Sequence, residues 1–210
     1  MELIHIVSFL EKALLHPLPG TDVQWEMASS DRRMLDYPRV KRDDSRLAAV
    51  MILLYPKDGK VMCLFMQRPQ YDGVHSGQIS FPGGKMEDSD KNLTQTAVRE
   101  TCEETGVCGK DISIIGKLTA LFIPVSNIEV SPVVAYMNSE PVFTPNDEEV
   151  VSLIEAPLEF FLDPSIIKEK PMLVRDEQLN VKYYDFEGSV IWGATAMILN
   201  ELLVILKGLE

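Results

Sequence analysis

The sequence is poor in basic residues and has no long apolar segment. Its 20 lysines and arginines are outnumbered by 32 aspartates and glutamates, which gives a formal net charge of −12. General binders of nucleic acid or of anionic membranes need a basic surface, so both classes are excluded. No apolar run reaches the roughly 20 residues that span a bilayer. The N-terminal segment also lacks the basic region and the small-residue cleavage site of a signal peptide.

Cysteine is also scarce, at three residues in 210. Cys63, Cys102 and Cys108 are odd in number and show no Cys-x-x-Cys spacing, which disfavours a disulfide framework or a zinc site. We therefore expect free thiols in a reducing compartment. This expectation, together with the absence of a signal segment, predicts a cytoplasmic protein.

The chain is long enough, at 46% hydrophobic residues, to bury one good core. We expect residues 1–45 to form an N-terminal helix and an irregular arm packed on a domain of residues 46–210. The order of predicted elements favours a mixed sheet between helices. These elements are strands over 48–55, 60–67, 112–122, 130–137, 172–174 and 181–186, a short helix over 156–162, and a buried helix over 193–206.

A further helix is predicted over residues 91–105. Small or apolar side chains recur along it at helical spacing, and Gly106 follows its last residue, as a glycine often does at a helix C-terminus. Asp88, Ser89 and Asp90 precede it as candidates for the N-cap.

Three glutamates of this helix, Glu100, Glu103 and Glu104, project into one sector roughly 100° wide. Like charges at these spacings repel by about 0.2–0.5 kcal/mol per pair, so the face is either solvated or neutralised by a cation. Arg99 is close enough to orient one carboxylate. A solvated acidic face is the simpler reading, but the glycine turn at Phe81–Lys85 favours a site that holds Mg²⁺ against a diphosphate.

The same residues resemble a known motif, the Nudix box Gly-x5-Glu-x7-Arg-Glu-U-x-Glu-Glu-x-Gly-U, in which U is a bulky aliphatic residue. The matching residues are Gly84, Arg99, Glu100, Glu103, Glu104, Gly106 and Val107, and Asp90 stands in place of the first Glu. Eight residues separate Asp90 from Arg99, and this extension is similar to the coenzyme A diphosphatase branch. The resemblance implies an α/β fold, a Nudix-type α/β/α sandwich with a mixed β-sheet, and Mg²⁺ or Mn²⁺ as cofactor.

The segment before the glycine turn resembles the additional signature of that branch. Its matching residues are Arg68, His75, Gly77, Gln78 and Phe81, whereas Gly73 stands where the signature has an arginine. For His75, substrate contact and a role as a loop brace both stay open.

A basic segment, Arg32, Arg33, Arg39, Lys41, Arg42 and Arg46, is either a phosphate-facing arm or a solvated, self-paired loop. Arg46 is the member that we favour for substrate contact, because it directly precedes a predicted strand.

The resemblance implies a hydrolase that cleaves the diphosphate of a nucleoside diphosphate linked to a group X. The leading candidate substrate is coenzyme A or a derivative, with 3′,5′-ADP and 4′-phosphopantetheine as products. ADP-ribose, a dinucleotide or a nucleotide sugar is the alternative substrate, and a non-catalytic nucleotide-sensing module is the alternative class. A homodimer is left open.

Three groups of residues carry this expectation. The expected metal ligands are Gly83, Gly84, Glu100, Glu103 and Glu104; the substrate-binding residues are Arg46, Arg68, His75, Gln78 and Phe81; and the catalytic residues are Glu149, Glu100 and Arg99. Glu149 is favoured as the general base, with Glu148 and Glu100 as alternatives.

Overall fold

A long strand, β1 (Arg46–Lys57), runs through the centre of the main sheet in the computed structural model, which describes residues 2–30, 41–73, 75–174 and 177–209. β1 pairs antiparallel with β2 (Lys60–Gln67) and parallel with β7 (Ile128–Tyr136), so the sheet is mixed. The β1–β2 turn is Asp58-Gly59, and both residues have positive φ. This is the conformation that a two-residue hairpin prefers, and the predicted hairpin is confirmed.

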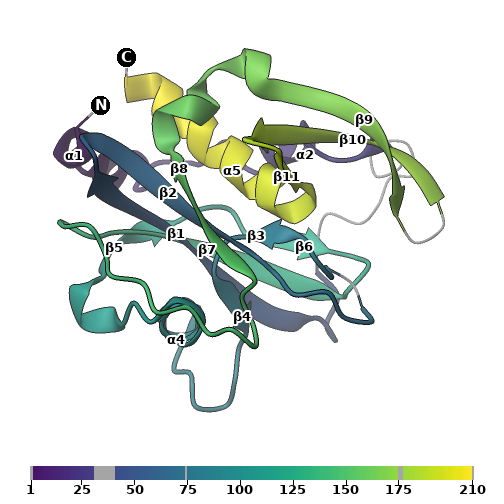
Figure 1. Ribbon diagram of the computed structural model, residues 1–210, viewed down its shortest axis with the longest axis horizontal. Coiled ribbons are helices and arrows are strands. Elements are labelled where there is room, and N and C mark those ends of the chain that lie inside the picture. The colour runs from purple at the N-terminus through teal and green to yellow at the C-terminus, as the bar shows by residue number, and fades with distance from the viewer. Residues whose placement is uncertain (1, 31–40, 74, 175–176, 210) are drawn as a thin grey trace.

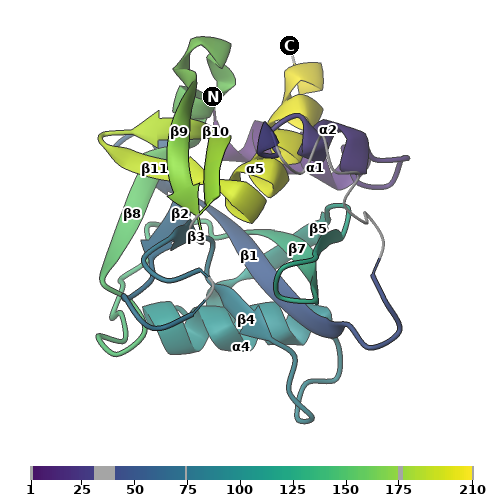
Figure 2. The same ribbon diagram turned by 90° about the vertical axis from the view of Figure 1, so that its right-hand side faces the viewer.

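The sheet is covered on both faces (Figures 1 and 2). Helix α4 (Leu93–Thr105) lies on one face, and α5 (Gly193–Leu206) lies on the other together with α1 (Leu3–Ala13). Alternate residues of β1 enter the two cores: Met51 and Leu53 face α4, and Ile52 and Leu54 face α5. A strand covered on both faces is apolar throughout, and the expected α/β/α sandwich is confirmed.

The remaining elements complete the main sheet and add a second, smaller one on the α5 side. The main sheet contains β3 (Ile79–Ser80), β4 (Gly83–Lys85), β5 (Ser113–Lys117), β6 (Leu121–Ile123) and β8 (Ser152–Pro157). The small antiparallel sheet contains β9 (Ile167–Val174), β10 (Glu177–Phe186) and β11 (Ser189–Trp192). Short helices are α2 (Thr21–Trp25) and the 3-10 turns Gly109–Asp111, Leu158–Leu162, Pro164–Ile166 and Lys207–Leu209.

Both long C-terminal predictions agree with the structure. α5 spans 193–206 as expected and is buried along most of its length. The second hairpin forms between β9 and β10. Helix α4 also forms where the periodicity placed it, and Gly106 ends it in a left-handed conformation with φ 76°.

Two local expectations are wrong. The strand over 112–122 is divided into β5 and β6, because the chain leaves the ladder after Lys117. The helix over 156–162 is the end of β8 followed by a 3-10 turn. β8 forms because it pairs with the distant β2 and because Glu155 accepts a hydrogen bond from the Tyr55 hydroxyl at 2.8 Å, and local sequence signals do not report such partners.

The N-cap of α4 is also different from the expected residues. Asn92 takes this position, and its side-chain Oδ1 accepts a hydrogen bond from the Gln95 backbone N–H at 3.0 Å. Asp90 is unavailable as a cap because its carboxylate is engaged by Arg99 and Thr96.

The expectation of three free thiols is wrong for two of them. Cys102 and Cys108 form a disulfide, whereas Cys63 is free and buried. The left-handed Gly106 reverses the chain after α4 and brings the two Cα atoms to 4.5 Å. Counting and spacing alone missed this pair because the turn supplies the proximity.

Residues before β1 are tied to the body of the molecule by the buried carboxylate of Glu201 on α5. It accepts hydrogen bonds from the Gly20 backbone N–H, the Gln24 side-chain amide, and both the backbone N–H and the hydroxyl of Thr119. Four donors meet one carboxylate, which is the way a buried charge is satisfied. Arg32, Arg33 and Arg39 of the basic segment lie outside the described residues.

None of the described helices is both long and apolar enough to cross a bilayer.

Candidate active site

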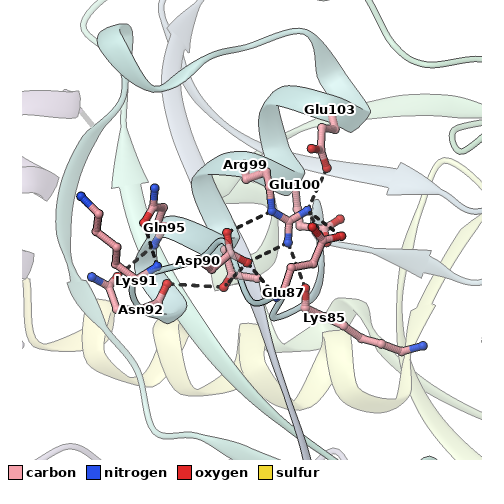
Figure 3. Close-up of polar contacts among 10 residues, drawn as sticks. Lys85, Glu87, Asp90, Lys91, Asn92, Gln95, Arg99, Glu100 and Glu103 are labelled. Carbon is pink, nitrogen blue, oxygen red and sulfur yellow. Dashed lines mark hydrogen bonds and ion pairs between the residues drawn. The ribbon is translucent and has the colours of Figure 1, made fainter.

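Arg99 is the centre of a carboxylate cluster at one side of α4 (Figure 3). Its Nε and Nη2 donate to the two carboxylate oxygens of Asp90 at 3.0 and 2.9 Å, and its Nη1 donates to Glu100 at 3.0 Å and Glu103 at 2.9 Å. These hydrogen bonds hold the pKa of Asp90 well below its usual range. The expected contact of Arg99 with one carboxylate is thus confirmed, and it extends to three.

Glu104 points in another direction, into the sheet. Its carboxylate is 2% exposed and accepts a 2.7 Å hydrogen bond from the Gly83 backbone N–H. Burial raises the pKa of Glu104 to about 8, while the Gly83 N–H and the charge of Arg68 act in the opposite direction. Adjacent glutamates therefore have different environments, because Glu103 faces solvent and Glu104 faces the glycine turn.

The two glycines of the turn are needed for space. A Cβ on Gly83 would collide with the β1 backbone at Ala49 and Val50, and a Cβ on Gly84 would collide with the Glu100 carboxylate. Both glycines belong to β4, which pairs with β1. The turn and α4 therefore bring backbone peptide groups into contact with two carboxylates.

The donor chemistry of this region suits a hard divalent cation. Glu100 and Glu104 offer carboxylate oxygens beside the backbone of Gly83 and Gly84, and Mg²⁺ prefers oxygen ligands. Burial raises the pKa of Glu100 as well as that of Glu104, so a cation would remove an ionisation penalty. Within the described residues, no three carboxylate, imidazole or thiol side chains are already gathered as a metal site, and Arg99 holds Glu100 and Glu103.

Glu149 lies in a loop docked on the C-terminal end of α4. The Thr144 N–H donates to the Thr105 carbonyl at 2.9 Å, and the Asn146 N–H donates to the Glu104 carbonyl at 3.1 Å. Glu149 is exposed, and its negative charge contributes to the raised pKa of both Glu100 and Glu104. Its neighbour Glu148 is also exposed, and its backbone N–H donates to the Asn146 side chain.

A cavity of about 380 Å³ adjoins the glycine turn. Its lining includes all five residues expected to bind substrate, together with Gly83 and Gly84; the five are Arg46, Arg68, His75, Gln78 and Phe81. They come from β1, the segment after β2, and the approach to β4. The structure therefore brings together residues that span 36 positions of sequence, counted from 46 to 81.

Cationic side chains dominate the charge of this cavity. Arg46, Arg68 and Lys85 line it, and no aspartate or glutamate is among its described lining residues. The Arg68 Nε and the Ser80 hydroxyl are buried there without a hydrogen-bond partner in the described part of the chain. A cavity of this kind in a chain of net charge −12 can bind an anion.

Individual residues in the lining have different environments. Phe81 is 1% exposed and stacks on Phe65 with ring centroids 4.9 Å apart, so it is a buried apolar part of the lining. His75 has φ 73°, and its Nδ1 lies 3.1 Å from Gln78 Oε1, a contact that braces the loop. The sequence analysis assigned no substrate-binding role to Ser80 or to Lys85, which the cavity lining adds.

An acidic helix packs on a glycine turn beside a basic cavity in an α/β/α sandwich, an arrangement that suits an anionic ligand together with a divalent cation. Residues 45–173 match the NUDIX domain model. The chain belongs to the NUDIX domain family and is a Nudix hydrolase, an enzyme that acts on pyrophosphate bonds.

The chain is similar to a curated relative in sequence and to solved structures in fold. The chain is 34% identical over 160 residues to an uncharacterized Nudix hydrolase, NudL, of Yersinia pestis (strain Pestoides F), covering 75% of this chain and 78% of that one. A MutT/nudix family protein from Enterococcus faecalis has a TM-score of 0.53 at 16% identity, covering 90% of this chain and 73% of that one. The NUDIX domain of Shewanella oneidensis NrtR, solved with ADP ribose, has a TM-score of 0.46 at 19% identity, covering 64% and 87%.

Proposed function

We propose that this protein is a Mg²⁺- or Mn²⁺-dependent diphosphatase of a nucleoside diphosphate linked to a group X, with coenzyme A or a derivative as the leading substrate. One observation carries this proposal. The basic cavity ends at the same glycine turn against which the carboxylates of Glu100 and Glu104 pack. An anionic nucleotide in the cavity would therefore have its diphosphate beside the carboxylates.

Each residue of the site has its own role in the proposed reaction. Glu100, Glu103 and Glu104, with a backbone carbonyl of Gly83 or Gly84, would hold the divalent cation. When bound, the cation would polarise a phosphate and lower the pKa of water. Arg99 orients Glu100 and Glu103, and Arg46 and Arg68 bind phosphate. Glu149 accepts the proton of the attacking water as the water oxygen bonds to phosphorus and the P–O–P bridge breaks.

Glu149 suits the base role better than Glu100. Glu100 is half-buried and paired with Arg99, and it would lie in the field of the cation, which makes it a ligand. Glu149 is exposed on the loop that packs against α4, and its charge acts on both neighbouring carboxylates.

Coenzyme A is favoured by the resemblance of the His75–Gln78 segment. Gly73 stands where the signature has an arginine, and it lines the same cavity as Arg46, Arg68 and Lys85, which supports a cationic contact there. We expect these cations to contact the 3′-phosphate. Coenzyme A should then have a higher kcat/KM than dephospho-coenzyme A; equal or reversed values would remove this contact.

A hydrolysis screen of the purified protein with Mg²⁺ tests the proposal directly. Coenzyme A, ADP-ribose, dinucleotides and nucleotide sugars are offered separately, and products are resolved by mass. Release of 3′,5′-ADP and 4′-phosphopantetheine from coenzyme A is expected, and excess EDTA should abolish it until Mg²⁺ or Mn²⁺ is restored. Turnover that persists in EDTA would refute the metal site, and binding without turnover of any compound would favour a nucleotide-sensing module.

A further inference from the structure

A second cavity, of about 580 Å³, adjoins the first. It lies between Gln67, Gly73 and residues 75–79 on one side and the small sheet of β9, β10 and β11 on the other. Gly73, His75 and Gln78 line both cavities. The two spaces therefore meet at the loop that the His75–Gln78 contact braces.

The wall between the cavities is anchored to the core of the molecule. The Thr195 hydroxyl at the start of α5 donates a buried 2.9 Å hydrogen bond to the Ile79 carbonyl of β3. β11 packs against β3, so the small sheet is held beside this strand. The second cavity is thus formed by β3 and β11, which pack together, by Met172 and Leu173 of β9, and by the described residues between 67 and 79.

The two cavities differ in charge. The first is lined by Arg46, Arg68 and Lys85, whereas the described lining of the second contains no lysine, arginine, aspartate or glutamate. The second cavity instead combines apolar side chains with uncharged hydrogen-bonding groups. Its apolar members are Ile79, Met172, Leu173, Val190 and Trp192, and its polar side chains include Gln67, Ser76 and Ser189.

We infer that the second cavity binds the group X, and that X is an extended uncharged arm that carries amide groups and methylene segments. This inference rests on the proposed function. Apolar side chains bury methylene groups, and the glutamine and serine side chains can hydrogen-bond to amides. A substrate with a nucleotide at one end of its diphosphate and such an arm at the other matches the order of a charged cavity followed by an uncharged one.

The same chemistry disfavours the other candidates for X. The second phosphorylated nucleoside of a dinucleotide polyphosphate would bring negative charge into a cavity without a described cation. A sugar, with its many hydroxyl groups, would cover less of the apolar surface of Met172, Val190 and Trp192 than a chain of methylene groups. Leu173, 74% exposed at the rim, would likewise be covered by an arm but not by a compact sugar.

A charged substitution at the rim of the second cavity tests the inference. Leu173→Glu adds a carboxylate to the second cavity, and Ile4→Glu is the matched control, since Ile4 is 62% exposed on α1 and lines neither cavity. Dephospho-coenzyme A and ADP-ribose share the ADP half and differ in X. We expect Leu173→Glu to raise KM for dephospho-coenzyme A at least about tenfold, a 1.4 kcal/mol effect. Ile4→Glu should leave both KM values unchanged.

For ADP-ribose the Leu173→Glu variant should keep the parental KM, or the parental inhibition constant if that compound is not hydrolysed. Equal changes for both compounds, or no change for dephospho-coenzyme A, would overturn the inference. Hydrolysis of coenzyme A would still be intact in that case, so the proposed function would stand.

A binding measurement separates the two proposals further. Trp192 lines the second cavity, while Trp25, the other tryptophan, is 5% exposed in the core. Pantetheine, the uncharged arm alone, should change the tryptophan fluorescence in a saturable way. Leu173→Glu should raise the dissociation constant of pantetheine at least about tenfold. Saturable binding without hydrolysis of any diphosphate would reject the function but retain the site. An unchanged signal over the parental concentration range would reject the site.

Discussion

Glu104 and Glu201 are both helical glutamates buried against the main sheet, on opposite faces, yet they are built into different surroundings. Glu201 is 0% exposed and accepts four hydrogen bonds from Gly20, Gln24 and Thr119. Glu104 is 2% exposed and accepts one, from the Gly83 N–H. Burial alone therefore does not define a role. The number of donors separates a carboxylate that holds the fold together from one that is available to a ligand.

The electrostatic surroundings sharpen this difference. Glu104 lies near the charges of Glu100 and Glu149, and burial raises its pKa to about 8. An under-satisfied carboxylate beside others of the same sign is typical of a functional site. Glu201 instead ties the segment before β1 to α5. The four predictions below test this contrast, from the largest expected effect to the smallest.

Glu149→Gln should cause the largest loss of activity. The variant keeps the shape of the side chain but removes the proton acceptor, which typically costs about two to four orders of magnitude in kcat. The Mn²⁺ concentration for half-maximal activity should stay near that of the parent. Glu100→Gln, by comparison, should weaken metal binding as well.

Glu148→Gln is the matched control, since Glu148 is the exposed neighbour on the same loop. It should retain parental turnover. The reverse result, with Glu148→Gln inactive and Glu149→Gln active, would transfer the base role to Glu148.

Glu104→Gln and Glu103→Gln should each lower kcat by at least about two orders of magnitude, because each removes a proposed metal ligand that acts in the transition state. Both proteins should remain folded by circular dichroism. Glu104→Gln should also be at least as stable as the parent at pH 8, since it removes a carboxylate whose ionisation is opposed by burial. Activities within a few-fold of the parent would mean that this face of α4 is only an acidic surface.

Glu201→Gln should do the opposite and reduce stability with little effect on kcat. The amide would leave at least one buried donor without an acceptor, which costs about 1–3 kcal/mol. Urea unfolding measures this change. Glu129→Gln is the control, because Glu129 pairs with Lys41 at the surface at 3.1 Å, and such pairs contribute about 0–1 kcal/mol. Equal losses in the free energy of unfolding for the two variants would contradict the stabilising role of Glu201.

The metal-free protein should become less stable as the pH rises from 5 to 8. The pKa of Glu104 is raised from an ordinary 4.5 to about 8, so the folded state binds more protons than the unfolded state in this interval and loses stability with increasing pH. We expect the melting temperature to fall by about 2–4 °C or more, the shift that 1 kcal/mol produces in a chain of this size. Mg²⁺ should raise the melting temperature more at pH 8 than at pH 5.

Glu104→Gln provides the control for this pH dependence and should flatten it. A parental slope in that variant would assign the titration to another group.

Much of the fold was predictable because its signals are local. The Asp58-Gly59 turn between two apolar runs predicts the hairpin, and the apolar run at 193–206 predicts a buried helix. Gly106 marks the end of α4. β8 and the division between β5 and β6 were not predictable, since both depend on pairing with strands that are distant in sequence.

The candidate site divides in the same way. The sequence determined the residue types, their spacing on α4 and their likeness to the Nudix box, because helical geometry turns spacing into a shared face. Tertiary structure alone decided that Glu104 is buried on Gly83 while Glu103 faces solvent, and that Cys102 meets Cys108. It also placed a cavity whose described lining has no lysine, arginine, aspartate or glutamate beside a basic one. Burial, disulfide proximity and cavity walls depend on contacts between segments far apart in the chain, and no local pattern encodes which segments will meet.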